Sequence, residues 1–451
     1  MTELGACFMK WSRYSILFES KRNGWLLFNT VSRSFLTVGE AQLPAIRAIM
    51  ADPEGFDYSP FPMLYMQLRS LGFLVEDSKD DDFYNIHKMR TLSFLYGNRS
   101  LMITFALSLA CNFDCSYCFE SSHSGPVMTQ ETEDRVMRFI QKFKADNLSI
   151  TWYGGEPLLA FDRIVSINRR LQDMGKNYSA SMITNGYLLT RDKADRLNEL
   201  RVSYLQITLD GARETHNSRR FLRGGGETYD RILENIDGVM ASDFRGTLHV
   251  RVNVDSRNED EFAQVYNLIR ERYPADFGKR ITVYPGFVKG DDHPDHSCFF
   301  DPVQQGEFLT HMMEKYQIAP FSLFPERRMQ GCILTRRNAF VIGPEGEVYK
   351  CWDDVGIPER VVGNVDNLRD WNMALIAEGM TGCSYLDSQE CRECFYFPIC
   401  DGGCHRIRQN NLHSTQPQSS CSYFKENLEN LLELHFERKK ELARQKREQK
   451  P

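Results

Sequence analysis

Three cysteines carry the first chemical signal in this chain. Cys111, Cys115 and Cys118 stand at C-x3-C-x2-C spacing, directly after the apolar run 103–109. Thiolates at this spacing can hold three irons of a 4Fe–4S cluster and leave the fourth iron without a protein ligand. An open iron beside a strand end is a place where a substrate can coordinate. Zinc is the alternative metal, because it also binds clustered thiolates.

A second group of cysteines lies in the last third of the chain. Eight of the thirteen cysteines fall between positions 332 and 421, and Cys383 stands apart within this group. Clustered cysteines in a reducing cytosol indicate metal more often than disulfides. The other seven exceed what one four-coordinate site uses, so two clusters are the simplest interpretation and two zinc sites the alternative. These seven are Cys332, Cys351, Cys391, Cys394, Cys400, Cys404 and Cys421.

Composition and charge exclude several functional classes. The formal net charge is −6, so nothing global indicates nucleic-acid binding. The sequence has no apolar run of about 18 residues, the length that predicts a membrane span. The first ten residues lack a basic-then-apolar signal pattern. We therefore expect a cytoplasmic protein that binds neither nucleic acid nor a membrane.

The central part of the chain must position the first cysteine group. Apolar β-runs alternate there with helical lengths, which predicts parallel βαβ units and an α/β barrel. Active sites of such barrels lie at the C-terminal ends of the strands, and the Cys111–Cys118 loop follows the first strand. We expect strands at 102–109, 148–153, 179–184, 203–209, 247–254 and 281–287, and helices at 129–145, 160–174, 190–200, 228–241 and 259–273. From about 320 onward this alternation stops.

The N-terminal part predicts a separate module. Two β-rich runs, 14–18 and 25–30, flank Asn23-Gly24, which is a strong hairpin signal. Helices are expected at 39–50 and 61–71, followed by a short strand at 73–76, which together suggest a winged-helix-like layout. The charged segment 78–82 is expected to be a linker. The predicted domains are 1–95 (winged-helix-like), 96–318 (barrel), 319–425 (cysteine-rich) and 426–451 (a charged C-terminal helix).

A second motif narrows the chemistry. Trp152-Tyr153-Gly154-Gly155-Glu156-Pro157 follows the second β-run. Together with the cysteine loop and the aromatic Tyr117 before its third cysteine, it resembles the motifs of radical S-adenosylmethionine (SAM) enzymes. The resemblance implies a partial (β/α)6 TIM-like barrel whose open iron chelates SAM. Reductive cleavage of SAM would then yield a 5′-deoxyadenosyl radical that abstracts a hydrogen atom.

The same resemblance implies which residues bind SAM. Tyr117, Gly154, Gly155 and Glu156 are expected there, with the last three near the methionyl amino group. Thr208, at the end of the fourth β-run, would lie near the ribose or carboxylate. Arg251, on the fifth β-run, would reach the carboxylate. Residues 210–220 also resemble the family's D-G-x4-H-x3-R pattern.

The downstream cysteines resemble the SPASM extension of radical SAM enzymes, which carries two auxiliary clusters. The resemblance implies three 4Fe–4S clusters in all. The inner auxiliary cluster would be held by Cys332, Cys351 and Cys404, with Cys383 as a fourth ligand or with one position open to substrate. The outer auxiliary cluster would be held by Cys391, Cys394, Cys400 and Cys421.

Enzymes of this kind mostly modify peptides or proteins. We predict a maturase that cross-links a ribosomally made peptide through a thioether or carbon–carbon bond, with residues 1–95 gripping a leader sequence by strand addition. The alternative is an anaerobic sulfatase-maturating enzyme. In that subclass an acidic residue, the expected base, directly follows the second auxiliary cysteine, whereas here Trp352 follows Cys351. A flavodoxin- or ferredoxin-type electron donor is implied in both cases. A non-catalytic iron–sulfur carrier or scaffold is the alternative from another class.

Overall fold

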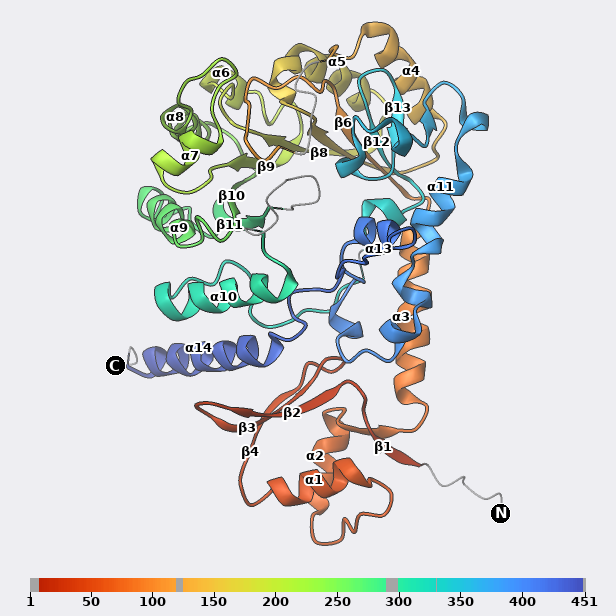
Figure 1. Cartoon of the computed structure of the whole chain (residues 1–451), viewed down its shortest axis with the longest axis vertical. Helices are drawn as coiled ribbons and strands as arrows, with labels where there is room; N and C mark the ends of the chain where they lie inside the picture. The colour runs from red at the N-terminus through yellow and green to blue at the C-terminus, as the bar shows by residue number, and fades with distance from the viewer. Residues whose placement is uncertain (1–7, 119–124, 289–298, 330, 449–451) are drawn as a thin grey trace. The chain divides into compact units, whose positions relative to one another are not determined.

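The chain consists of two compact units (Figure 1). The structure, a computed structural model, describes residues 8–118, 125–288, 299–329 and 331–448. Unit 1 combines Met1–Leu95, Asp301–Cys332 and Cys383–Pro451. Unit 2 combines Tyr96–Phe300 and Ile333–Gly382. Each unit therefore joins segments that are distant in the sequence.

Unit 2 is built on a nine-stranded sheet with the strand order β11-β10-β9-β8-β7-β6-β12-β13-β14. Strands β6 to β11 pair in parallel and follow one another across the sheet, and each overlaps a predicted strand. The sheet does not close, so the predicted α/β fold with a partial barrel is confirmed. The six strands are β6 (Ser100–Ala106), β7 (Asn147–Tyr153), β8 (Asn177–Thr184), β9 (Val202–Thr208), β10 (Thr247–Val254) and β11 (Ile281–Phe287).

Helices connect these parallel strands and surround the sheet in Figure 1. Four of them agree with the predicted helical segments. The predicted helix 190–200 is regular only as α6 (Arg191–Ala194), and α7 (Arg213–Arg219) was not predicted. The other four helices are α4 (Gln130–Gln141), α5 (Phe161–Gln172), α8 (Tyr229–Met240) and α9 (Glu261–Arg272).

Side chains alternate along the strands, as a sheet with one apolar side requires. On β10, Leu248, Val250 and Val252 are fully buried. Arg251 and Asn253 occupy the intervening positions and belong to the opposite side of the sheet. Polar side chains therefore reach the side of the sheet away from this aliphatic layer, near the C-terminal end of β10.

Three further strands extend the sheet beyond β6. Strand β12 (Ala339–Ile342) pairs in parallel with β6, whereas β13 (Glu347–Tyr349) and β14 (Gly363–Asn364) are antiparallel. The alternation of strands and helices stops near residue 320, as expected, but these three short strands were not predicted. All four residues of β12 are buried, and so short an apolar run gives no period to detect. One short helix, α11 (Met373–Ala377), follows.

The N-terminal part of unit 1 contains the predicted hairpin. Strands β2 (Ser15–Ser20), β3 (Gly24–Asn29) and β4 (Phe35–Val38) form an antiparallel sheet in that order. Strand β1 (Met9–Trp11) pairs with β5 (Leu74–Glu76). Helices α1 (Leu43–Ala51) and α2 (Pro62–Ser70) share a core with these strands. The predicted strands and helices of this segment are thus confirmed.

The charged segment 78–82 is not a linker, contrary to the prediction. It opens helix α3 (Lys79–Leu95), whose first turn carries Asp80, Asp81 and Asp82. Carboxylates are favourable at a helix N-terminus because they face the positive end of the helix dipole. Asp80 is buried and accepts hydrogen bonds from Ser12 Oγ and the Arg13 backbone N–H, both at 2.9 Å. In the sequence alone, acidic residues at a helix N-terminus cannot be distinguished from acidic residues in a loop.

Helix α3 packs on the cysteine-rich segment of the same unit. Tyr14, Tyr84, Tyr385, Leu386 and Phe397 form one buried cluster. The remaining helices of unit 1 are α10 (Pro302–Tyr316), α12 (Gln389–Arg392), α13 (His405–Asn411) and α14 (Leu428–Glu448). Among the described residues, no helix is long and apolar enough to cross a membrane.

Candidate functional site

The cysteine loop of unit 2 is held along its length by a second loop. It begins after β6 at Cys111 and is described as far as Cys118. Its backbone N–H groups at Asp114 and Ser116 donate to the carbonyl oxygens of Phe221 (3.0 Å) and Arg219 (3.1 Å). The Arg223 N–H donates to the Asn112 carbonyl at 2.9 Å. The segment 219–223 therefore fixes the backbone that carries the three thiols.

The sulfur environment suits a metal-bound thiolate. Cys111 Sγ accepts a hydrogen bond from the Phe113 N–H at 3.4 Å and lies 3.9 Å from Asn185 Nδ2. Burial raises the pKa of the Cys111 thiol to about 12, and it also raises the pKa of Cys115, which the nearby Arg220 charge opposes. Thiols with raised pKa values stay protonated until a metal displaces the proton. N–H donors to sulfur also tune the potential of a bound cluster.

Gly154 and Gly155 lie against the backbone that leads into the cysteine loop. A Cβ on Gly154 would come within 2.5 Å of the Ser108 carbonyl oxygen, and one on Gly155 within 2.3 Å of the Ala110 carbonyl oxygen. The Gly155 N–H donates to Ser108 O at 3.1 Å. The two glycines thus allow the second motif to pack directly on the first, a structural role that the sequence did not predict.

Glu156 is buried and fully engaged with the protein. Its carboxylate accepts hydrogen bonds from Thr184 Oγ1 (2.7 Å), the Asn185 N–H (2.8 Å) and the Leu158 N–H (3.0 Å). Burial raises the pKa of this carboxyl group. The Asn185 side chain in turn donates to Asn112 Oδ1 at 2.8 Å. Glu156 therefore orients Asn185 toward the cysteine loop.

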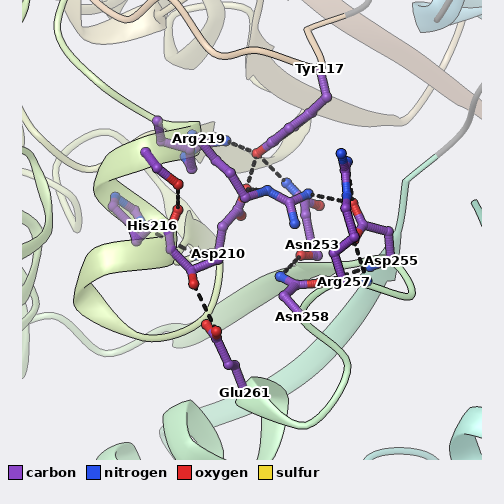
Figure 2. Close-up of polar contacts among 12 residues, drawn as sticks. Tyr117, Asp210, His216, Arg219, Asn253, Asp255, Arg257, Asn258 and Glu261 are labelled. Atoms are coloured by element: carbon purple, nitrogen blue, oxygen red, sulfur yellow. Dashed lines mark hydrogen bonds and ion pairs between the residues drawn. The ribbon is translucent and has the colours of Figure 1, made fainter. Parts of the chain in front are cut away.

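Tyr117 is the centre of a polar network that Figure 2 shows. Its hydroxyl donates to Asp210 Oδ2 and accepts from Arg220 Nη1 (2.6 Å) and Asn253 Nδ2 (2.9 Å). The Arg219 guanidinium lies 5.0 Å from the centre of the Tyr117 ring. Residues of β10 and of the loops after β6 and β9 thus meet at one side chain.

The residues that match D-G-x4-H-x3-R act as a scaffold for this network. The Asp210 N–H donates to His216 Nδ1 at 3.1 Å, so His216 carries its proton on Nε2, which lies 3.0 Å from Thr228 Oγ1. Thr228 Oγ1 donates to the Arg220 carbonyl oxygen. Burial lowers the pKa of His216 well below its usual value, so the ring is neutral. His216 is a structural residue in this arrangement.

One buried charge, Asp255, completes the network and was missed in the sequence. Asp255 is fully buried and pairs with Arg219 at 3.1 Å and with Arg257 at 3.0 Å (Figure 2). Burial alone would raise the Asp255 pKa, but the two guanidinium groups hold it below its usual value. Asp255 directly follows β10, so its place at a strand end was the signal available in the sequence.

Thr208 and Arg251 are brought together. They are direct partners in the parallel pair of β9 and β10. Arg251 Nε donates to Asn253 Oδ1 at 2.8 Å, and Asn253 continues to Tyr117. The predicted SAM contacts Arg251 and Tyr117 are therefore linked through Asn253, which the sequence did not single out although it lies two residues after Arg251 on the same side of β10.

The cysteines assigned to the outer cluster lie close together in unit 1. Burial raises the pKa of Cys394, and the thiols of Cys391 and Cys421 interact with it electrostatically. Three of the four sulfurs have hydrogen-bond donors: Arg408 Nη1 lies 3.8 Å from Cys391 Sγ, the Gly402 N–H 3.3 Å from Cys400 Sγ, and Lys425 Nζ 3.8 Å from Cys421 Sγ. Two of these donors are cations, which suits a sulfur set that carries negative charge once metal binds.

The cysteines assigned to the inner cluster belong to both units. Cys351 is in unit 2, and Cys332, Cys383 and Cys404 are in unit 1. Cys383 is buried, and its thiol lies 3.8 Å from the His405 carbonyl oxygen. The ligand set of this cluster stays a prediction. Among the described residues, no three His, Cys, Asp or Glu side chains are spaced to hold a metal ion.

Comparison with known proteins identifies a domain within the chain. Residues 106–269 match the model of the radical SAM superfamily. The cysteine-type anaerobic sulfatase-maturating enzyme of Clostridium perfringens (strain 13 / Type A) is 23% identical over 360 residues, which cover 72% of this chain and 94% of that protein. The match begins at the last residue of β6 and includes the cysteine loop and β7 to β10.

Two solved structures share the fold. Native anSMEcpe with bound AdoMet (SAM) aligns with a TM-score of 0.58 at 20% identity, covering 77% of this chain and 99% of that chain. Streptococcus suis SuiB bound to precursor peptide SuiA aligns with a TM-score of 0.51 at 13% identity, covering 92% of this chain and 99% of that chain. A radical SAM domain implies a 4Fe–4S cluster and SAM, and the C-x3-C-x2-C spacing of Cys111, Cys115 and Cys118 in the sequence suits three ligands of such a cluster. The chain thus carries a radical SAM domain and is an enzyme that resembles peptide and protein maturases.

Proposed function

We propose that this enzyme modifies a ribosomally made peptide by forming a thioether or carbon–carbon cross-link. The observation that carries the proposal is the anchored Cys111–Cys118 loop, packed on Gly154 and Gly155 in a chain that also has eight cysteines between positions 332 and 421. When bound, the clusters and SAM supply a 5′-deoxyadenosyl radical that abstracts a hydrogen atom, and an acceptor for the electron released as the new bond closes.

The residues of this chain hold that chemistry in place. Cys111, Cys115 and Cys118 bind the SAM-cleaving cluster. The Glu156–Asn185–Asn112 chain of hydrogen bonds supports the backbone beside Cys111. These contacts are made within the protein, so the backbone beside Cys111 is held before SAM binds.

The SAM site of the proposal lies between the cysteine loop and β10. Arg251 is the residue for the SAM carboxylate, and Thr208, its partner on β9, lies beside it. Arg251 Nε donates to the neutral side chain of Asn253, and Arg251 forms no ion pair with a carboxylate among the described residues. This supports a cation that is available to an anionic group. Tyr117, Gly154, Gly155 and Glu156 shape the same region.

We propose further that the hairpin sheet of unit 1 binds the leader part of the peptide. Strands β2 and β4 are the edges of the three-stranded sheet, and edge strands are where an extended peptide adds. The Thr30 N–H bonds Tyr14 O at 2.8 Å, so alternate N–H groups of β2, including that of Glu19, point away from β3. Glu19 is also exposed.

Sulfatase maturation is the second candidate, because a sulfatase-maturating enzyme is among the sequence relatives. Trp352 directly follows Cys351 and is exposed, and Asp353 is the next residue. An acidic residue is thus displaced by one position from the place where that subclass is expected to carry its base.

We also propose ligands for the two auxiliary clusters, an electron donor and a cellular compartment. Cys391, Cys394, Cys400 and Cys421 hold an outer 4Fe–4S cluster, and Cys332, Cys351 and Cys404 an inner one, with Cys383 as its fourth ligand. A flavodoxin or ferredoxin delivers the electron for SAM cleavage. We place the reaction in the cytoplasm, where thiols stay reduced.

Mass spectrometry of the product distinguishes the two functions. The reconstituted enzyme is given dithionite, SAM and either a short peptide encoded beside its gene or a cysteine-containing sulfatase peptide. Cross-linking removes a pair of hydrogen atoms and keeps the sulfur, whereas formylglycine formation removes the sulfur. Turnover of the sulfatase peptide alone would overturn the cross-linking proposal.

Strand addition is tested separately by fluorescence anisotropy with the same encoded peptide. Glu19→Pro removes an outward N–H from β2, and Glu19→Gln changes only the side chain. We expect the proline variant to weaken binding at least about tenfold, since several main-chain bonds depend on register, and the glutamine variant to bind normally. Thr37→Pro tests β4 in the same way. Unchanged affinity in both proline variants would refute leader binding at this sheet.

A further inference from the structure

Gly286 lies on β11, next to the residue assigned to the SAM carboxylate. The parallel pairing of β10 with β11 places Asn253 opposite Gly286 and Arg251 opposite Tyr284. Residues paired directly across two strands point to the same side of a sheet, so Gly286 belongs to the polar side that carries Arg251 and Asn253. Gly286 is buried. It is therefore the neighbour of these two side chains on the next strand.

The backbone conformation does not explain the glycine at this position. The φ angle of Gly286 is not positive, so a residue with a side chain could adopt the same backbone. Glycine inside a strand weakens it, and it often marks a place where another group comes close. The reason for this glycine therefore lies in the space around its Cα.

The Arg251 side chain occupies the space that a side chain at position 286 would fill. A Cβ on Gly286 would lie 2.1 Å from Arg251 Nε and 2.7 Å from both Cζ and Nη2. Non-bonded heavy atoms are normally about 3.5 Å or more apart. The Arg251 guanidinium thus lies directly against the Gly286 Cα, and a methyl group there would displace it by about 1 Å.

The nearest of these three atoms also makes the hydrogen bond that orients the guanidinium. Arg251 Nε donates to Asn253 Oδ1 at 2.8 Å, and Asn253 Nδ2 donates to the Tyr117 hydroxyl at 2.9 Å. Because the guanidinium is a rigid plane, fixing Nε also fixes the direction of both Nη groups. A Cβ at position 286 would therefore break the link to Asn253 and turn the Nη groups away.

We propose that Gly286 is a positioning residue for SAM. The space left by its missing side chain holds the Arg251 guanidinium in the orientation that binds the SAM carboxylate. This inference rests on the proposed function, in which Arg251 is the residue for that carboxylate. A guanidinium binds a carboxylate through two parallel hydrogen bonds, so a displacement of about 1 Å removes most of the interaction. Gly286 acts through Arg251 and not by contact with SAM.

The test is a double-mutant cycle on the SAM affinity of the reconstituted full chain, measured by isothermal titration calorimetry without reductant so that SAM stays intact. We expect Arg251→Ala to bind SAM about tenfold or more weakly, the effect of losing a charged hydrogen bond. Gly286→Ala should lose most of the same affinity. The double variant should match Arg251→Ala within about twofold, because the added methyl group then displaces nothing.

Urea unfolding of the same variants distinguishes positioning from a purely structural role. The obstacle to the new methyl group is the end of a flexible side chain, and alanine suits a strand better than glycine. Gly286→Ala should therefore unfold at the wild-type urea midpoint or above it. Gly238→Ala is the matched control, since its new Cβ on α8 has its nearest neighbour 4.0 Å away, and it should bind SAM normally.

The outcomes separate this inference from the proposed function. Normal SAM affinity in Gly286→Ala, with weak binding by Arg251→Ala, would overturn the inference and leave the role of Arg251 intact. Normal affinity in Arg251→Ala would reject that role and the inference with it. The inference would also fall if Gly286→Ala weakened binding equally in the Arg251→Ala background, or if it lowered the urea midpoint in both backgrounds.

Discussion

Replacing Gly155 with alanine separates two roles of the Gly-Gly-Glu motif, contact with SAM and contact with the cysteine loop. The new Cβ would lie 2.3 Å from the Ala110 carbonyl oxygen and 2.5 Å from that of Leu109. Carbon–oxygen contacts are normally about 3.3 Å or longer, so the backbone must move by about 1 Å. Both obstacles are backbone atoms that cannot rotate away. We therefore expect a loss near the upper end of overpacking costs, about 3 kcal/mol.

The assay compares the melting temperature of the metal-free chain, the iron content after reconstitution and the affinity for SAM. We expect Gly155→Ala to lower the first two, because the strained segment also carries the hydrogen bond from the Glu156 N–H to Ala110 O (3.0 Å). Gly238→Ala is the control: its nearest neighbour, the Arg191 Cα, is 4.0 Å away, and alanine favours helix α8 by about 1 kcal/mol. A Gly155→Ala variant with normal stability and iron content, but weak SAM binding, would refute the packing role.

Three further predictions follow from the same contacts. Cys115→Ala should abolish 5′-deoxyadenosine formation while iron bound by the downstream cysteines remains, and persistent SAM cleavage would reject the ligand assignment. Glu156→Gln should destabilise unit 2 by about 2 kcal/mol in urea unfolding. The carboxylate accepts hydrogen bonds from three groups, and the NH2 group of glutamine would face at least one of them and leave it without an acceptor. An unchanged unfolding midpoint would contradict this prediction. Lowering the pH from about 7 to about 5 should cost unit 1 about 2 kcal/mol through His87, whose pKa burial lowers from 6.5 to about 4. As the pH falls, the unfolded chain takes up this proton before the folded chain does. The contribution of His87 to stability is therefore full above pH 6.5 and is lost as the pH falls toward 4. His87→Leu should flatten this part of the plot of stability against pH, and an equal slope in both proteins would disprove the assignment.

The sequence predicted the strands of the parallel sheet well because each is an apolar run long enough to show its type. It predicted the cysteine loop and Gly-Gly-Glu because these residues are close in sequence and follow strands directly. Strand β12 escaped detection because a four-residue buried run has no period. Helix α3 was mistaken for a linker because Asp80 becomes buried only through Ser12 and Arg13, partners more than sixty residues away.

The candidate site shows the same division between local and distant information. Tyr117 was singled out by its neighbours Cys115 and Cys118. Its hydroxyl partners Asp210, Arg220 and Asn253 come from later parts of the chain, and only the fold brings them together. Spacing therefore singled out the predicted cluster ligands, whereas the polar network around Tyr117 required the structure.

The discontinuity of unit 1 has a consequence for how the protein is made. During synthesis the ribosome releases the hairpin and α3 long before the segment that completes their core. The Tyr84 hydroxyl bonds to the Leu386 carbonyl, a residue 302 positions later, and Thr30 Oγ1 donates to Phe395 O at 2.9 Å. All of unit 2 emerges in that interval, while the side of α3 that carries Tyr84 is still uncovered. A chaperone that shields this helix during translation would therefore raise the yield of folded enzyme.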